Sequence, residues 1–192
     1  MHTPATTTSI THALDLADER HWTHRPPGKP VARLRVLLKI QEPATLAARI
    51  FALPPAVHRW AQGDDLDRLT DTHARLIERE IYRSWQPAVR RRAHEQILQH
   101  SGCVTVQLQA RFTYTTPAGE FPDHRMRRLT EDLPAEHASR LFDARHRDAD
   151  DSELRRILAD GIGEAYFFRA LPPDQQQAAL TISDLERVQF HY

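Results

Sequence analysis

Cys103-Val-Thr-Val-Gln-Leu-Gln-Ala-Arg-Phe-Thr-Tyr-Thr-Thr116 is the most regular stretch of the chain, because apolar and polar residues alternate along it without a break. Alternation with a period of two predicts a β-strand that has one buried and one solvated face. The buried face would carry Val104, Val106, Leu108, Ala110, Phe112 and Tyr114, and the solvated face Thr105, Gln107, Gln109, Arg111 and Thr113. A half-solvated strand of this kind belongs to an antiparallel or mixed sheet that helices cover on one side only.

Three further strands are predicted around this one. Residues 31–40 also alternate, with Leu34, Val36, Leu38 and Ile40 on one face. Thr116-Pro-Ala-Gly119 has the residues of a tight turn, so the chain is expected to return as a strand through residues 121–130. The last strand is expected at residues 185–192, with Val188, Phe190 and Tyr192 inward.

Helical segments are predicted between the strands. Helical spacing of apolar residues indicates helices at 43–54, at 55–62 and from Asp64 or Asp65 to residue 100, with an interruption at Pro87. Residues 135–142 and a segment capped by Ser152 are also expected to be helical, and a short helix is expected through Gln177.

The resulting element order is βαββαβ, which is that of the ferredoxin-like superfold of the α+β class. The expected structure is a four-stranded antiparallel or mixed sheet with helices on one face and an enlarged first crossover. Right-handed crossovers would place the strands at 31–40 and 121–130 in the centre and the other two at the edges. A different α+β sandwich is the alternative. Ferredoxin-like domains serve many functions, so the fold alone names none.

The chain is expected to form one domain after an N-terminal arm. Residues 1–30 have little apolar periodicity and end in the breaker Arg25-Pro-Pro-Gly-Lys-Pro30, which predicts a loosely ordered arm. Residues 31–192 would then be a single α+β domain, a size that can bury a full core. The arm is predicted to be dispensable for folding.

Composition excludes several classes of protein. A hydrophobic content of 40% and a charged content of 27% are typical of globular proteins, and no apolar run is long enough to span a bilayer. No basic start or apolar segment of a secretory signal is visible, so a cytoplasmic location without membrane contact is expected. Cys103 is the only cysteine, which excludes an intramolecular disulfide and a cysteine zinc cluster. Arginines greatly outnumber lysines, a bias that codon usage in a GC-rich bacterial genome would also produce.

One face of the predicted sheet is expected to be basic. The chain has zero net charge, so nucleic acid could be attracted only by a local patch. If the apolar faces of the strands meet the helices, the opposite face gathers cationic side chains from all four strands: Arg33, Arg35, Lys39, Arg111, Arg125, Arg127 and Arg187. Such a face would suit phosphate groups or an acidic partner. The alternative is an ordinary polar sheet face, and no exposed aromatic residues for base stacking are evident on it.

Enzymatic motifs are not found. The chain has no Gly-x-Ser-x-Gly elbow, P-loop, Rossmann fingerprint or His-Glu-x-x-His pair. The segment His146–Asp151 has imidazole and carboxylate groups, but its spacing matches no metal-binding loop, so neither a metal nor a cofactor is expected. A metal-independent ribonuclease could use His124 or His191 as a general base beside the basic face.

The sequence therefore predicts a non-enzymatic binding or accessory protein whose basic sheet face contacts nucleic-acid phosphates. A subunit that assembles with itself or with a protein partner is the first alternative. A ribonuclease is the second.

Overall fold

The computed structural model describes residues 7–100, 103–116, 119–169 and 179–192. In these residues the protein is of the α+β class, with helices and one three-stranded antiparallel sheet in the order β2-β1-β3. The strands are β1 (Val104–Thr116), β2 (Gly119–Leu133) and β3 (Ala179–His191). β1 is thus the central strand, whereas the sequence predicts it at an edge.

Eight α-helices are found in the described part of the chain. They are α1 (Ile10–Asp18), α2 (Pro30–Ile40), α3 (Pro43–Arg49), α4 (Pro54–Gln62), α5 (Asp71–Ser84), α6 (Pro87–Gln99), α7 (Ala135–His146) and α8 (Asp151–Ile162). A π-helical turn, Gly163–Phe167, follows α8 directly. Pro87 begins α6, as its missing N–H predicts, but α5 begins at Asp71 after a cap by Thr70 rather than at Asp64 or Asp65.

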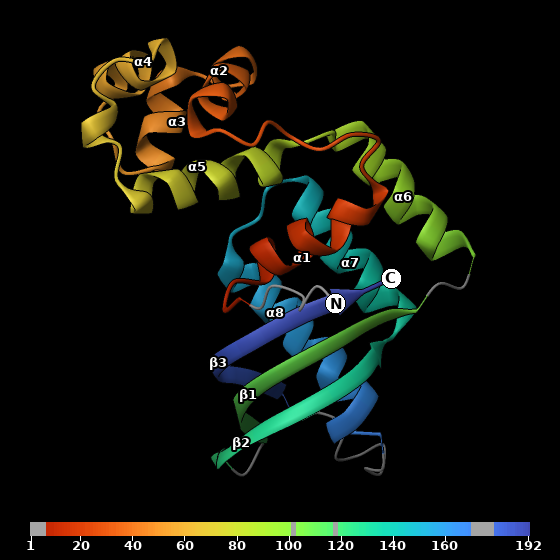
Figure 1. The fold of residues 1–192 in the computed structure, drawn as a ribbon. Helices are drawn as coiled ribbons and strands as arrows, with labels where there is room; N and C mark the ends of the chain where they lie inside the picture. Colours follow the sequence, from red (N-terminus) through yellow and green to blue (C-terminus); the bar gives the residue numbers. More distant parts are fainter. Residues whose placement is uncertain (1–6, 101–102, 117–118, 170–178) are drawn as a thin grey trace. The chain divides into compact units, whose positions relative to one another are not determined.

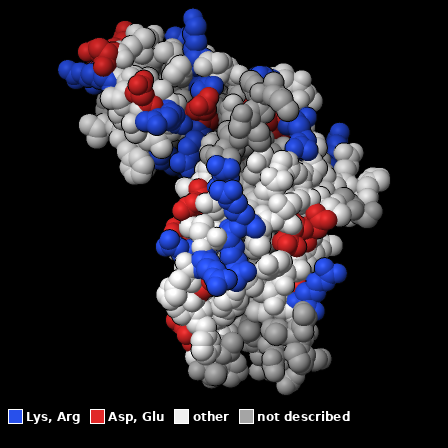
Figure 2. Space-filling model, turned by 60° about the horizontal axis from the view of Figure 1, so that its bottom comes forward, with Lys and Arg blue, Asp and Glu red and all other residues white. Residues whose placement is uncertain are grey.

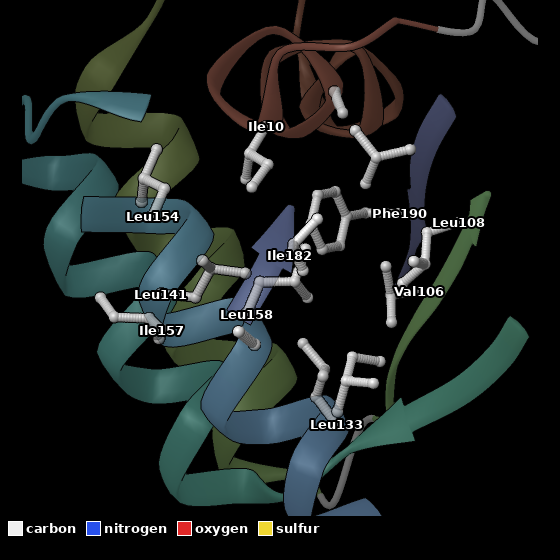
Figure 3. Packing of buried hydrophobic residues seen from close by; sticks show 14 of the residues in the cluster. Ile10, Val106, Leu108, Leu133, Leu141, Leu154, Ile157, Leu158, Ile182 and Phe190 are labelled. Carbon is white, nitrogen blue, oxygen red and sulfur yellow. The ribbon is translucent and has the colours of Figure 1, made fainter. Parts of the chain in front are cut away.

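The alternation along β1 correctly predicts its buried face. Val106, Leu108 and Phe112 are buried, and they lie opposite Phe190, Val188 and Ile182 of β3. Helices α7 and α8 lie on one side of the sheet (Figure 1). Side chains from these helices, from α1 and from the strands point toward one centre, among them Ile10, Leu141, Leu158 and Phe190 (Figure 3). The sheet therefore has one face that is covered by helices, as predicted.

The predicted strand at residues 31–40 is wrong, because this segment forms helix α2. Pro30 occupies the first turn, where a proline is pre-organised for a helix. Leu34 and Leu37, which are three residues apart, are the buried residues of α2 and satisfy helical spacing as well as Leu34, Val36 and Leu38 satisfy alternation. A four-stranded ferredoxin-like sheet is therefore not formed by the described residues.

The N-terminal segment is not a loosely ordered arm where it is described. Ser9 caps α1 by accepting a hydrogen bond from the His12 N–H, and Ile10 and Leu14 are fully buried in the core under the sheet. Before α1, Thr7 pairs with Val188 on β3. Residues that the sequence assigns to the arm thus belong to the same core as β1.

The chain divides into two compact units rather than at residue 30. We call residues 1–21 with 88–192 the sheet unit and residues 22–87 the helical unit. The helical unit has a core of its own, formed by Leu34, Leu37, Leu46, Ala47, Ile50, Val57, Trp60, Ala61, Ile77 and Ile81. Leu34, Ile77 and Ile81 therefore belong to a different core from β1, although the sequence predicts a single domain for residues 31–192.

Two sequence expectations fall partly or wholly on residues outside the described ranges. They are the turn at 116–119 and the short helix through Gln177. In the part of the chain that the structure describes, no helix has both the length and the apolar character needed to cross a membrane.

Candidate functional site

The residues of the predicted basic face do not all belong to one sheet. Arg33, Arg35 and Lys39 belong to α2 in the helical unit, so they are not part of the sheet. Only the predicted arginines of β1, β2 and β3 lie on strands; they are Arg111, Arg125, Arg127 and Arg187.

Arg127 is on the wrong side of the sheet for the predicted face. It lies opposite Ala110, a buried residue, and its guanidinium is 5.6 Å from the centre of the Phe167 ring. Along β2, Arg127 lies two residues before the buried Leu129 and six before the buried Leu133, so alternation places it on the covered side of the sheet. Arg128, opposite Gln109, is the residue that faces solvent on the open side.

The open face also carries acidic side chains. Asp132 accepts a hydrogen bond from Thr105, Glu186 accepts one from Gln109, and Asp184 lies 3.6 Å from Arg111. Figure 2 shows a band of Lys and Arg side chains on the face that it draws, with Asp and Glu side chains on both sides of it. The open face is thus polar and mixed in charge, which is the ordinary-face alternative. The hypothesis of nucleic-acid binding itself stays a prediction.

The two candidate catalytic histidines are not brought together. His191 lies opposite Thr105 on β3, and His124 lies in the bulged part of β2 near Arg111. Thr105 and Arg111 are six residues apart on β1, so the two histidines are about 20 Å apart along the strand at roughly 3.3 Å per residue. His124 and His191 cannot act on one reacting group.

Basic charge is concentrated in the helical unit instead. Residues 22–87 contain eleven Lys and Arg against seven Asp and Glu, while the rest of the chain contains fifteen against nineteen. Four of the seven acidic residues lie between the end of α4 and the first turn of α5; they are Asp64, Asp65, Asp67 and Asp71. Away from this segment the helical unit has a clear excess of positive charge.

Two of the predicted binding arginines have structural contacts. Arg33 pairs with Glu78 at 2.8 Å and also donates to the Pro27 carbonyl. Arg35 donates to the Ala61 carbonyl at 2.6 Å, which satisfies an orphan carbonyl in the last turn of α4. Both guanidiniums therefore hold the helical unit together.

The remaining cations of the helical unit are available to solvent. Those that are exposed and form no ion pair with a described residue are Arg25, Lys29, Lys39, Arg68, Arg75 and Arg79. Of the acidic residues outside the 64–71 segment, Glu78 and Glu80 are already paired with arginine, which leaves Glu42. These cations are thus the largest set of uncompensated charge in the unit.

Three of these cations lie near one another. The Arg33–Glu78 ion pair joins the first turn of α2 to the middle of α5. Lys29 precedes Arg33 by four residues, and Arg75 and Arg79 lie three residues before and one residue after Glu78. Arg75 is on the same side of α5 as Glu78, Arg79 follows Arg75 by four residues and shares its face, and Lys29 is one turn before Arg33. We call Lys29, Arg75 and Arg79 the basic surface.

A second chemically notable cluster lies buried in the sheet unit, where α1, α6, α7 and the end of β3 meet. Arg90 pairs with Asp18 at 2.5 Å, and Arg145 donates to Asp15 through Nε at 2.9 Å. Tyr192 donates to Asp18 at 2.6 Å. Both aspartates and both arginines are at most 4% exposed, so each charge depends on its partner for solvation.

A chain of two histidines leads from this cluster toward solvent. Nε2 of His94 donates to Asp18 at 2.7 Å, and Nδ1 of His94 lies 3.0 Å from Nε2 of His146. Burial, together with the charges of His94, Arg91 and Arg90, lowers the pKa of His146 to about 4. Burial opposes ionisation of Asp18, but the hydrogen bond and charge of His94, the charge of Arg90 and the hydrogen bond of Tyr192 together lower the pKa of that carboxyl. The buried cluster is thus a balanced ionic network that ties four elements together.

The lowered pKa of His146 predicts a loss of stability in acid. The unfolded chain takes up a proton on this histidine below about pH 6.5, whereas the folded chain does so only near pH 4. The free energy of unfolding should therefore fall as the pH drops from 6.5 to 4, and this fall should be smaller in His146→Gln. Urea titrations of both proteins across this range measure the difference, and parallel curves would mean that His146 makes no such contribution.

A hollow of about 430 Å³ lies beside the π-helical turn and is lined by His137, Asp160, Glu164, Phe168, Arg169, Ala179 and Leu180. His137 Nε2 is 2.9 Å from Glu164, and Arg140 contacts His137 Nδ1 at 3.3 Å. Both ring nitrogens are engaged, which leaves no nitrogen for acid or base work. A Cβ on Gly163 would lie 2.7 Å from the Phe168 ring, so this position needs glycine. The hollow presents charges of opposite sign and does not define a ligand.

Sequence reasoning missed both the buried cluster and the basic surface. The only local signal for the cluster was the spacing of Asp15 and Asp18, which fall on the same side of α1 as Ile10 and Leu14. For the basic surface, the signal was the uneven charge of residues 22–87. No family model, no curated protein and no solved structure matches this chain.

Proposed function

We propose that the protein binds nucleic acid through the basic surface of its helical unit, with contacts mainly to phosphate. The observation that supports this is the set of exposed cations that form no ion pair with a described residue, in a unit where Glu78 and Glu80 are already paired with other arginines. Lysine and arginine side chains that can neutralise phosphates release condensed counterions, and this supplies most of the affinity of sequence-independent binding.

The proposed binding surface lies on the helical unit and not on the sheet face. Phosphate contacts position a protein without reading bases, so no sequence preference is expected from Lys29, Arg75 and Arg79 alone. Ribonuclease activity based on His124 or His191 is a separate hypothesis. It requires that bound RNA is cut, and that His124→Ala or His191→Ala prevents cleavage while binding is kept.

The test is a comparison of two triple variants in full-length protein. Lys29→Glu with Arg75→Glu and Arg79→Glu should weaken binding to a fluorescent DNA duplex by at least about tenfold at low salt. Arg111→Glu with Arg125→Glu and Arg187→Glu makes the same change of charge on the strands. Once the long-range effect of the lower net charge is allowed for, the affinity of this variant should stay within about twofold of that of wild type. Fluorescence anisotropy gives both values, and circular dichroism checks the folds.

Other outcomes are equally informative. Loss of binding in the strand variant alone would place the contact on the sheet. Wild-type protein that binds neither duplex nor single-stranded nucleic acid at low salt would reject the proposal.

A further inference from the structure

Helices α3 and α4 are joined by a turn of four residues, 50–53. Phe51 in this turn has the left-handed backbone, with φ +54°, and its N–H donates to the Ala48 carbonyl. The Ala52 N–H donates to the Ala47 carbonyl. A left-handed residue just after a helix ends that helix and redirects the chain. Two helices joined by a turn of this length have the form of a helix–turn–helix unit.

Buried residues fix α4 against the rest of the helical unit. The core residues of α3, the turn and α4 are at most 7% exposed: Leu46, Ala47, Ile50, Val57, Trp60 and Ala61. Their spacing of one, three and four residues places them on the inner sides of the two helices. α4 packs against α2 and α3 (Figure 1). The orientation of α4 is therefore set by its inner side, and its outer side takes no part in the core.

The outer side of α4 is exposed and mostly polar. It is formed by residues at three- and four-residue spacing: Pro55, His58, Arg59 and Gln62. Arg59 forms an ion pair with Asp65 at 3.0 Å through Nε and is still 51% exposed. α4 itself contains no Asp or Glu. Its outer side thus offers hydrogen-bond donors and acceptors, and it has none of the large apolar anchors that are typical of protein interfaces.

Cations lie beside α4. Arg35 of α2 is exposed and donates to a carbonyl in the last turn of α4, so this side of α2 meets α4. Lys39 follows Arg35 by four residues and lies on the same side of α2. The acidic segment that follows α4 begins at Asp64, beyond the C-terminal end of the helix, and Glu42 precedes α3. The outer side of α4 and the adjacent side of α2 are therefore complementary to phosphate groups.

A helix with such an outer side fits the major groove of B-form DNA. An α-helix with its side chains is about 10–12 Å across, and the groove is about 12 Å wide. In helix–turn–helix proteins the second helix lies in this groove, and residues from its N-terminal part contact the base edges. The major groove of duplex RNA is too deep and narrow for such contacts, so DNA is the expected ligand.

We propose that α3 and α4 form a helix–turn–helix unit that recognises a specific sequence of duplex DNA, with α4 in the major groove. His58 and Arg59 contact the base edges, because arginine presents two parallel donors that match guanine and histidine can donate to a base acceptor. The inference rests on the proposed function, since it requires that the helical unit binds nucleic acid. It adds base recognition to the phosphate contacts.

The test is selection from DNA duplexes with a randomised core, with full-length protein. Wild type should enrich one sequence and bind it at least about a hundredfold more tightly than a shuffled duplex of the same composition. His58→Ala with Arg59→Lys keeps the positive charge but removes the imidazole and the guanidinium. This variant should lower the ratio of the two affinities at least about tenfold and keep the affinity for the shuffled duplex within about twofold. Arg92→Lys with His100→Ala makes the same changes at exposed positions in and after α6, and it should leave the ratio unchanged.

Phosphate binding and base recognition are separated by a second comparison. Lys29→Glu with Arg75→Glu and Arg79→Glu should weaken binding of the selected and the shuffled duplex by similar factors, so that their ratio is kept.

Three results would overturn the inference while the proposed function stands. They are binding of duplexes without enrichment of any sequence, an unchanged ratio in His58→Ala with Arg59→Lys, and tighter binding of duplex RNA or of single strands than of the selected duplex. A lack of binding to every nucleic acid at low salt would reject the proposed function and this inference together.

Discussion

Asp18→Ala is expected to destabilise the protein by about 3–5 kcal/mol, the range for breaking a buried ion pair from one side. The side chain of Asp18 is 1% exposed and is the shared partner of Arg90, His94 and Tyr192. Its removal leaves the Arg90 guanidinium, 4% exposed, without this carboxylate in a place where water cannot replace it. Guanidinium titration of the folded fraction measures the change.

Asp184→Ala is the matched control for this experiment. Asp184 pairs with Arg111 at 3.6 Å, but both side chains are about half exposed, so the pair is screened by solvent. The expected loss is below about 1 kcal/mol. Similar losses in the two variants would show that the buried cluster contributes no more than a surface pair.

Leu14→Ala in α1 is expected to cost about 2–5 kcal/mol, because it deletes a fully buried leucine from the core under the sheet. Leu16→Ala changes the same residue type in the same helix at a partly exposed position and should cost clearly less. Thermal or urea unfolding compares the two. If Leu14→Ala left stability unchanged, the sequence prediction that residues 1–30 are dispensable for folding would be supported instead.

Local sequence patterns predicted the sheet unit better than the helical unit. The alternation along β1 holds over the whole strand, and tertiary packing against Leu129 and Val188 agrees with it. At residues 31–40 the same kind of alternation was misleading, because its leucines also satisfy helical spacing. Only Pro30 distinguishes a helix from a strand here, because proline favours the first turn of a helix. The sequence prediction gave more weight to the alternation than to this proline.

The candidate surfaces were harder to predict because they depend on register and on contacts between elements. Arg127 was predicted on the open face, but it lies two residues before the buried Leu129 and therefore on the covered side, near Phe167. The buried cluster combines residues from four elements, and no spacing in the sequence relates Asp18 to His94 or Tyr192. Arg33 and Arg35 are not on the sheet because their segment is a helix.

The salt dependence of binding tests the proposed function most directly. For wild type, the logarithm of the association constant for a DNA duplex should fall linearly with the logarithm of salt concentration. The variant with glutamates at Lys29, Arg75 and Arg79 should have a slope shallower by about 2.7, since each lost phosphate contact contributes about 0.9. An unchanged slope in this variant, or a shallower one in the strand variant, would contradict the account.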